Sequence, residues 1–259
     1  MNAIVDTLIK EFKKFPQVEA VALGGSVAAE TDDDKSDIDI EVFVTKDIPV
    51  EARRRLIEKY SGKYEVGCDY FGPGDEFLAG KDGPVLDVMY PNIGWVEKIL
   101  DNVWEKHRPA NGYTTCVLFT IKNCTVLYDR NGWLAGIKKR LAAPYPMELR
   151  DNIIRRNLML LADKPFASYR EQIEKALKRG DVNSVNHRLA AFMASYFDII
   201  FALNGLLHPG EKRLVKYAEE HCQILPEYFA KNINHLLKQP NPATLKILDQ
   251  MLICLKKCL

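Results

Sequence analysis

The sequence predicts an α+β protein in which a sheet-containing N-terminal domain is followed by an all-helical domain. Segments with the period-two apolar pattern of strands occur only before residue 130. After the Pro-Tyr-Pro sequence at 144–146, apolar residues recur at helical spacing along almost the whole chain. We therefore expect one domain over residues 1–143 and a helical bundle over residues 144–259.

The elements of the first domain follow from periodicity and turn signals. Apolar residues at helical spacing predict a first helix over 3–15, and Pro49 marks the start of another over 50–60. A Gly-Pro-Gly sequence at 72–74 ends a predicted strand, and we expect a loop from there to residue 83. The predicted strands are 18–23, 38–44, 64–71, 85–90 and 125–128, and further helices are expected after residue 26, over 93–106 and over 114–121.

The second domain is expected to consist of helices separated by breaks rich in glycine and proline. The segment 189–207 is apolar enough to resemble a membrane span, but Asp198 lies near its middle. Because a charge at the centre of a bilayer costs at least about 2.5 kcal/mol, we expect a buried core helix and no membrane association. The predicted helices are 147–162, 169–179, 182–204, 211–221, 226–237 and 242–259.

Composition limits the partners and the compartment. The formal net charge is +1, so no overall electrostatic field favours nucleic acid, and we do not expect a polynucleotide substrate. The six cysteines include no Cys-x-x-Cys pair, which disfavours a zinc site. Their irregular spacing in a chain of this size disfavours a disulfide framework. The first residues read as an amphipathic helix rather than a cleavable leader. We therefore expect a cytoplasmic protein with reduced thiols, and the sequence is compatible with a homodimer.

The most informative segment lies between Leu23 and Val44. It reads Leu-Gly-Gly-Ser, ten further residues, and then Asp-Ile-Asp-Ile-Glu-Val-Phe-Val. Asp37 and Asp39 are two positions apart in a predicted strand, so their side chains point to the same side of it. Adjacent carboxylates repel each other, and a divalent cation such as Mg²⁺ removes the repulsion. The pattern therefore predicts a metal site at Asp37 and Asp39.

The residues before the acidic pair have the chemistry of a phosphate cradle. Gly24 and Gly25 allow backbone N–H groups to approach a polyphosphate closely, and a helix starting after Ser26 would direct its N-terminal dipole at the same anion. A phosphate cradle next to metal-binding carboxylates indicates phosphoryl or nucleotidyl transfer. The competing interpretation is a tight turn and an acidic surface loop beside an ordinary strand. Alternation of Asp37 and Asp39 with isoleucines disfavours it, since acids are depleted within strands.

This segment resembles the signature of the DNA polymerase β-like nucleotidyltransferase superfamily, in which Gly-Ser is followed after a spacer by Asp-x-Asp on a strand. The matching residues are Gly25-Ser26 and Asp37-Ile38-Asp39. The resemblance implies a mixed sheet flanked by helices, one or two Mg²⁺ ions, and ATP or another nucleoside triphosphate as co-substrate. The two-domain plan is similar to that of lincosamide and aminoglycoside adenylyltransferases and their uncharacterised relatives.

The resemblance also implies a third carboxylate on a neighbouring strand. Asp87 is the best candidate, because it is an isolated acid in the apolar strand 85–90, where burial is costly unless the acid is paired or metal-bound. Its implied roles are metal ligand and general base on the acceptor hydroxyl. An edge-strand acid facing water is the competing interpretation. Asp69, Asp75 and Glu76 are rival candidates for the third carboxylate.

The implied function is transfer of a nucleoside monophosphate, with AMP from ATP as the first expectation, to a hydroxyl of a small molecule. An antibiotic-like acceptor is the analogy that the related enzymes provide. Asp37, Asp39 and Asp87 carry the chemistry, and Gly24, Gly25 and Ser26 hold the phosphates. Two alternatives stay open, namely AMP transfer to a protein side chain and a nucleotide-binding regulatory module without catalysis.

Overall fold

The structure is a computed structural model that describes residues 3–24, 37–70, 72–81, 83–163, 166–238 and 243–259. It divides into two compact units, here called the N-terminal unit and the helical unit. The first comprises Met1–Leu100 and Thr120–Pro144, and the second comprises Asp101–Phe119 and Tyr145–Leu259. The predicted boundary at residue 143 is adjacent to the break between Pro144 and Tyr145, whereas residues 101–119 group with the helical unit.

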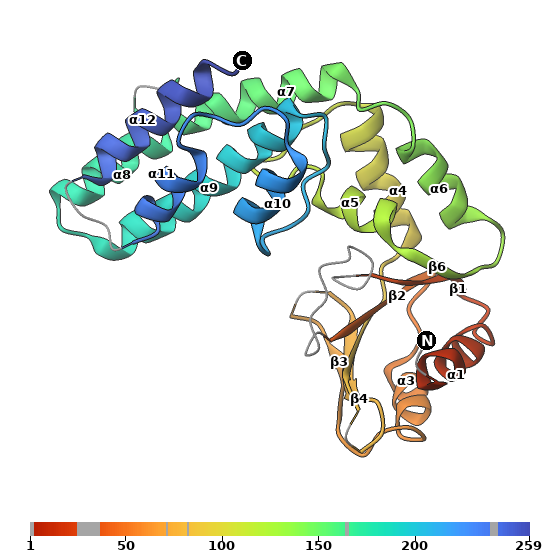
Figure 1. The fold of residues 1–259 in the computed structure, drawn as a ribbon. Coiled ribbons are helices and arrows are strands. Elements are labelled where there is room, and N and C mark those ends of the chain that lie inside the picture. Colours follow the sequence, from red (N-terminus) through yellow and green to blue (C-terminus); the bar gives the residue numbers. More distant parts are fainter. Residues whose placement is uncertain (1–2, 25–36, 71, 82, 164–165, 239–242) are drawn as a thin grey trace. The chain divides into compact units, whose positions relative to one another are not determined.

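A mixed sheet forms the N-terminal unit (Figure 1). Within the described residues it has six strands in the order β3-β4-β5-β2-β1-β6. The pairing of β2 with β5 is parallel, and the other neighbours are antiparallel. This confirms the predicted α+β class. The strands are β1 (Val18–Leu23), β2 (Ile38–Val44), β3 (Tyr64–Cys68), β4 (Gly74–Leu78), β5 (Val85–Met89) and β6 (Thr125–Asp129).

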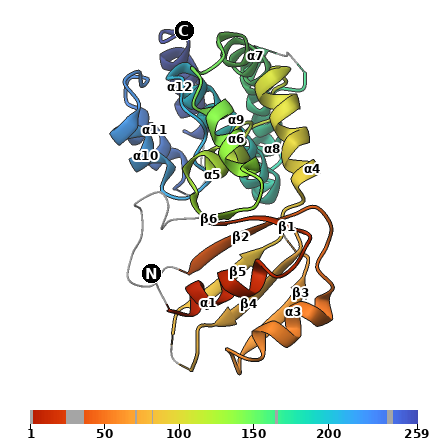
Figure 2. The same ribbon diagram turned by 90° about the vertical axis from the view of Figure 1, so that its right-hand side faces the viewer.

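One face of this sheet is apolar and carries the core of the unit. Helices α1 (Ala3–Phe12) and α3 (Val50–Ile57) lie on that face (Figure 2). Leu8, Phe12 and Ile57 of these helices are fully buried against strand residues that point to the same side. Because strand side chains alternate, the residues between these core positions must point to the opposite face.

The opposite face has its own helical cover next to β1 and β6. Helix α6 (Trp133–Leu141) packs on these strands, and Phe43 of β2 contacts Trp133 with ring centroids 5.3 Å apart. The Trp133 indole N–H donates to Glu97 of α4 (Ile93–Ile99) at 2.8 Å. The chain continues from α4 as a π-helix over Leu100–Glu105, and α5 spans Cys116–Asn123.

Strand β4 corrects a prediction, because a loop was expected at these residues. Asp75 points to the apolar side of the sheet, where its carboxylate accepts hydrogen bonds from Arg53 at 2.8 Å and from the Tyr90 hydroxyl at 2.7 Å. The Gly67 N–H also donates to it at 2.9 Å. Burial raises the pKa of Asp75, while these partners oppose that change. Asp75 therefore forms a structural ion pair, and it lies on the wrong face to join the other candidate acids.

The helical unit is organised around α9 (Val182–Leu203), as predicted for this segment. Phe192, Tyr196 and Phe201 of α9 are fully buried in the core of the unit. None of the described helices combines the length and the apolar character needed to span a bilayer. The other elements are α7 (Met147–Leu158), a π-helix over Met159–Asp163, α8 (Tyr169–Lys178), α10 (Leu214–His221), α11 (Phe229–Leu236) and α12 (Thr244–Lys256).

A buried carboxylate, Asp198, lies in α9. It accepts hydrogen bonds from the Thr114 N–H at 3.0 Å, the Thr114 hydroxyl at 2.6 Å and the Asn157 amide at 3.0 Å. Burial raises the pKa of Asp198 to about 6, although these donors favour the ionised form. His208 is also fully buried, and burial lowers its pKa to about 4. As the pH rises from 4 to 6, ionisation of Asp198 therefore lowers the stability of the folded protein, whereas the depressed pKa of His208 makes that stability rise.

The Asp198→Asn variant is expected to gain stability relative to the wild type as the pH rises from 4 to 6. In the unfolded chain the carboxyl ionises near pH 4, whereas the folded carboxyl keeps its proton to about pH 6. Ionisation therefore destabilises the wild type by up to roughly 3 kcal/mol over this range, and an amide does not ionise.

Urea denaturation at intervals between pH 4 and 7 measures the difference in unfolding free energy. The opposite contribution of His208, whose depressed pKa makes stability rise with pH, is present in both proteins and cancels in that difference. A difference that stays constant with pH would show that Asp198 does not titrate in this way.

Candidate active site

Strand β2 presents acidic side chains on the face opposite α1 and α3. Asp39 and Glu41 alternate with the buried residue Ile40, which belongs to the apolar face. Asp37 precedes the strand in the same alternation, and its charge is close enough to raise the pKa of Asp87. Period-two geometry thus gathers these carboxylates on one side, which we call the acidic face.

Strand β5 adds Asp87 to the acidic face. In the parallel pairing of β2 and β5, Asp39 lies directly beside Asp87. Paired residues on neighbouring strands point to the same side of a sheet, so the two carboxylates are neighbours. Burial, followed by the Asp37 charge, raises the pKa of Asp87. The structure therefore places Asp39 beside Asp87, with Asp37 near enough for its charge to act on Asp87, and the catalytic roles of all three remain predictions.

Glu41 is a member of the acidic face that the sequence interpretation missed. Burial raises its pKa to about 7, with further contributions from the charges of Asp39 and Asp87. Near neutral pH this side chain is therefore close to half protonated. The signal was present in the sequence, because Glu41 continues the period-two spacing of Asp37 and Asp39.

Gly24 lies against these acids at the end of β1. Its N–H donates to the Asp39 carbonyl at 3.0 Å. A Cβ atom at this position would lie 3.3 Å from Glu41 Cγ and 3.8 Å from Asp39 Cβ, so a larger residue would press on Glu41. Glycine therefore keeps this backbone close to the carboxylates. The other predicted phosphate-binding residues, Gly25 and Ser26, and the helix expected after them lie outside the described residues.

The rival candidates fall at other places. Glu76 of β4 pairs with Asp87 and lies on the acidic face, with its side chain exposed. Glu65 of β3 pairs with Glu76, so acidic residues occupy paired positions on β3, β4 and β5. Asp69 is exposed directly after β3. Of these acids, Glu76 is the neighbour that the register places next to Asp87.

The donor chemistry of the acidic face fits a hard divalent cation. Carboxylate oxygens are the ligands that Mg²⁺ prefers, and a cation would offset both the burial and the neighbouring negative charges that raise the pKa of Asp87 and of Glu41. In the part of the chain that the structure describes, no three His, Cys, Asp or Glu side chains converge closely enough to hold a metal ion. Metal binding by Asp37, Asp39 and Asp87 therefore stays a prediction.

The Glu41→Gln variant is expected to stabilise the N-terminal unit at pH 8 in the presence of EDTA. The folded pKa of Glu41 is about 7, above that of an unfolded glutamate, so the wild type loses stability as the pH rises from 4.5 to 7. The gain should reach roughly 3 kcal/mol at pH 8 and be close to zero below pH 4.5.

Urea denaturation of both proteins at the two pH values measures this gain. The matched control is Glu65→Gln, which removes an exposed acid of the same sheet face and should change the unfolding free energy little. An equal effect of the two substitutions would contradict a strained carboxylate at Glu41.

Comparisons with known proteins find similarity to two families, each over part of the chain. Residues 6–68 match the family model described as Polymerase beta, Nucleotidyltransferase, and residues 112–214 match a domain of unknown function, DUF4037. A crystal structure of a nucleotidyltransferase-like protein from Exiguobacterium sibiricum 255-15 is 11% identical, with a TM-score of 0.48, and the alignment covers 98% of this chain and 72% of that one. A search of curated proteins found no match.

The match to the nucleotidyltransferase family includes the strands that carry the predicted motif. It spans α1, β1, β2, α3 and β3, and therefore Gly24, Asp37 and Asp39. The chain contains a polymerase β-like nucleotidyltransferase domain, which confirms the superfamily to which the sequence motif pointed.

Proposed function

We propose that this protein is a Mg²⁺-dependent nucleotidyltransferase that moves a nucleoside monophosphate from a nucleoside triphosphate to a hydroxyl of a small molecule. The observation that carries the proposal is the pairing of Asp39 on β2 with Asp87 on β5, next to Asp37. This pairing occurs in a domain whose first strands match the nucleotidyltransferase family. The family match supports the reaction class, and the clustered carboxylates support a metal-assisted mechanism.

In this proposal Asp37 and Asp39 hold the metal, with Asp87 as a further ligand. When bound, Mg²⁺ supplies positive charge that offsets the triphosphate and the charge that develops on the departing pyrophosphate. Gly24, followed by Gly25 and Ser26, provides the backbone that approaches the β- and γ-phosphates. The absence of a side chain at Gly24 supports this role, because the backbone there already lies against Glu41 and Asp39.

Asp87 is the proposed general base. Its place directly beside Asp39 in the pairing of β2 and β5 supports this role, because it puts a carboxylate next to the proposed metal ligands, where the acceptor hydroxyl would have to lie. In the transfer step the acceptor hydroxyl gives its proton to Asp87, its oxygen forms a bond to the α-phosphorus, and the bond from that phosphorus to the pyrophosphate oxygen breaks. Glu41 is a positioning residue in this scheme, because it influences the reaction through Asp39 and Asp87.

The nearly neutral net charge of the chain favours a small acceptor over a polynucleotide. The net charge of +1 provides no field that would attract a polynucleotide, so end addition to nucleic acid is disfavoured. Among small acceptors, ATP-derived AMP transfer to an antibiotic-like molecule is the first class to test, by analogy with the adenylyltransferases that the two-domain plan resembles. The proposal also includes a cytoplasmic setting, where nucleoside triphosphates and Mg²⁺ are available.

Transfer can be tested with α-labelled ATP, GTP, CTP and UTP, Mg²⁺, and a panel of hydroxylated metabolites, antibiotics and proteins. We expect label on a small molecule with release of pyrophosphate, and an Asp39→Asn variant that folds normally but loses at least about a hundredfold in rate. Glu65→Gln is the matched control on the same sheet face and should keep its activity.

The outcome separates the alternatives. Label on a protein would replace the small-molecule proposal with protein AMP-transfer. Nucleotide binding without pyrophosphate release, across the whole acceptor panel, would favour a regulatory module. Undiminished transfer by Asp39→Asn would refute the assignment of the acidic face.

A further inference from the structure

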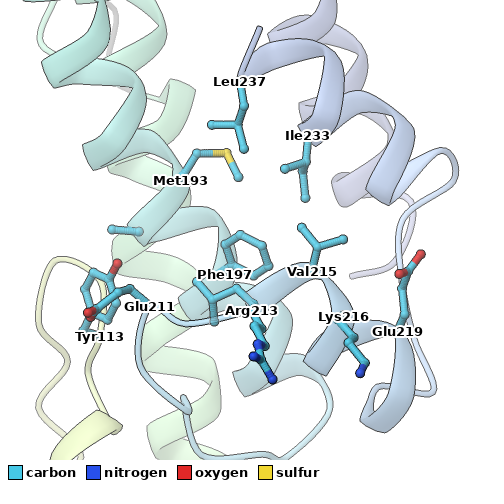
Figure 3. Close-up of a pocket in the computed structure, with 12 residues that line it drawn as sticks. Tyr113, Met193, Phe197, Glu211, Arg213, Val215, Lys216, Glu219, Ile233 and Leu237 are labelled. Carbon is cyan, nitrogen blue, oxygen red and sulfur yellow. The ribbon is translucent and has the colours of Figure 1, made fainter. Parts of the chain in front are cut away.

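The helical unit contains a pocket of its own, with a volume of about 500 Å³ (Figure 3). Its walls come from α9, α10 and α11, and the segment before α5 contributes Tyr113. Met193, Phe197, Val215 and Ile233 form an apolar interior. This volume lies within the range of roughly 300–1,000 Å³ that is typical of small-molecule sites.

The rim of the pocket is charged but balanced. Glu211 lies next to Tyr113 at one end, and its charge, after burial, contributes to raising the pKa of the Tyr113 hydroxyl (Figure 3). Arg213, Lys216 and Glu219 line the rim further along. Because acids and bases occur together, the rim has no strong preference for an anion or a cation. A bound molecule would therefore be recognised through its apolar body and a polar, uncharged end.

The polar wall is held in a strained and fixed conformation. Tyr113 and Arg213 have positive φ angles of 55° and 54°, which bulky residues rarely adopt and which cost of the order of 1–3 kcal/mol each. The Tyr113 ring packs on buried His208, with centroids 4.6 Å apart. Gly112 has no space for a side chain, because a Cβ there would lie 2.8 Å from Ala194 Cβ. Within the described residues, Tyr113 and Arg213 are two of four non-glycine residues with a positive φ angle, and strain of this kind occurs at preorganised binding sites.

We propose that this pocket binds an uncharged amphipathic small molecule, independently of nucleotidyl transfer. The apolar body would pack among Met193, Phe197 and Ile233, and a hydroxyl or similar polar group would meet Tyr113 and Glu211. The proposal combines the volume, the apolar interior, the balanced rim and the strain at two lining residues. It assigns a ligand to the helical unit, whose C-terminal helices lie outside both family matches.

The neutral fluorescent probe N-phenyl-1-naphthylamine tests this proposal with the full-length protein. We expect saturable binding with enhanced, blue-shifted emission. The Leu237→Ser variant, which removes an aliphatic side chain at the pocket, should weaken binding about tenfold. Ile253→Ser is the matched control, because Ile253 is similarly exposed (59% against 66% for Leu237) but does not line the pocket.

A second variant, Met193→Trp, fills the interior and should abolish binding while the melting temperature reports an intact fold. Equal probe affinity in the wild type and in both pocket variants would overturn the proposal, as would the absence of saturable binding. Clearly tighter binding of the anionic probe 8-anilinonaphthalene-1-sulfonate would overturn the inference of an uncharged ligand. None of these readouts depends on nucleotide turnover, so failure here and failure of the proposed transfer activity are distinguishable.

Discussion

The candidate active site depends on the parallel register of β2 and β5, because this register places Asp39 directly beside Asp87. Like charges at paired positions destabilise a sheet, and the charges of this cluster add to burial in raising the pKa values of Asp87 and Glu41. The apolar face, with α1 and α3 packed on it, supplies the compensating stability. A sheet that is stable through one face can carry an electrostatically unfavourable cluster on the other.

A buried aspartate and a partly buried one, in neighbouring strands, show how a structural acid differs from a candidate functional acid. Asp75 on β4 is satisfied by Arg53, the Tyr90 hydroxyl and a backbone N–H, all of which favour its ionised form. The main influences on Asp87 are burial and the charge of Asp37, and both oppose ionisation. A divalent cation would reverse that balance for Asp87, whereas Asp75 has no need of one. The difference lies in which face of the sheet each side chain occupies.

The acidic residues of β2 and β5 could be predicted from the sequence. The alternation of acidic and apolar residues along β2 and the isolation of Asp87 in an apolar strand can both be read from the order of the residues. Strand β4 was missed, since a Gly-Pro-Gly sequence usually ends a strand and acids are disfavoured within one. Asp75 is accommodated there by tertiary partners that are distant in sequence, namely Arg53, the Tyr90 hydroxyl and the Gly67 N–H. The late start of α10 likewise depends on the positive φ angle of Arg213, which periodicity cannot reveal. Long-range pairing and local backbone strain are thus the information that the sequence patterns lacked.

Metal binding by the acidic face can be tested directly by a crystal structure of the protein with Mn²⁺ and a non-hydrolysable nucleoside triphosphate analogue, with anomalous scattering used to locate the metal. We expect an anomalous peak within coordination distance of the carboxylates of Asp37 and Asp39, on the acidic face that also carries Asp87, with the triphosphate against Gly24. A nucleotide bound elsewhere, or a peak that none of these carboxylates coordinates, would contradict this expectation.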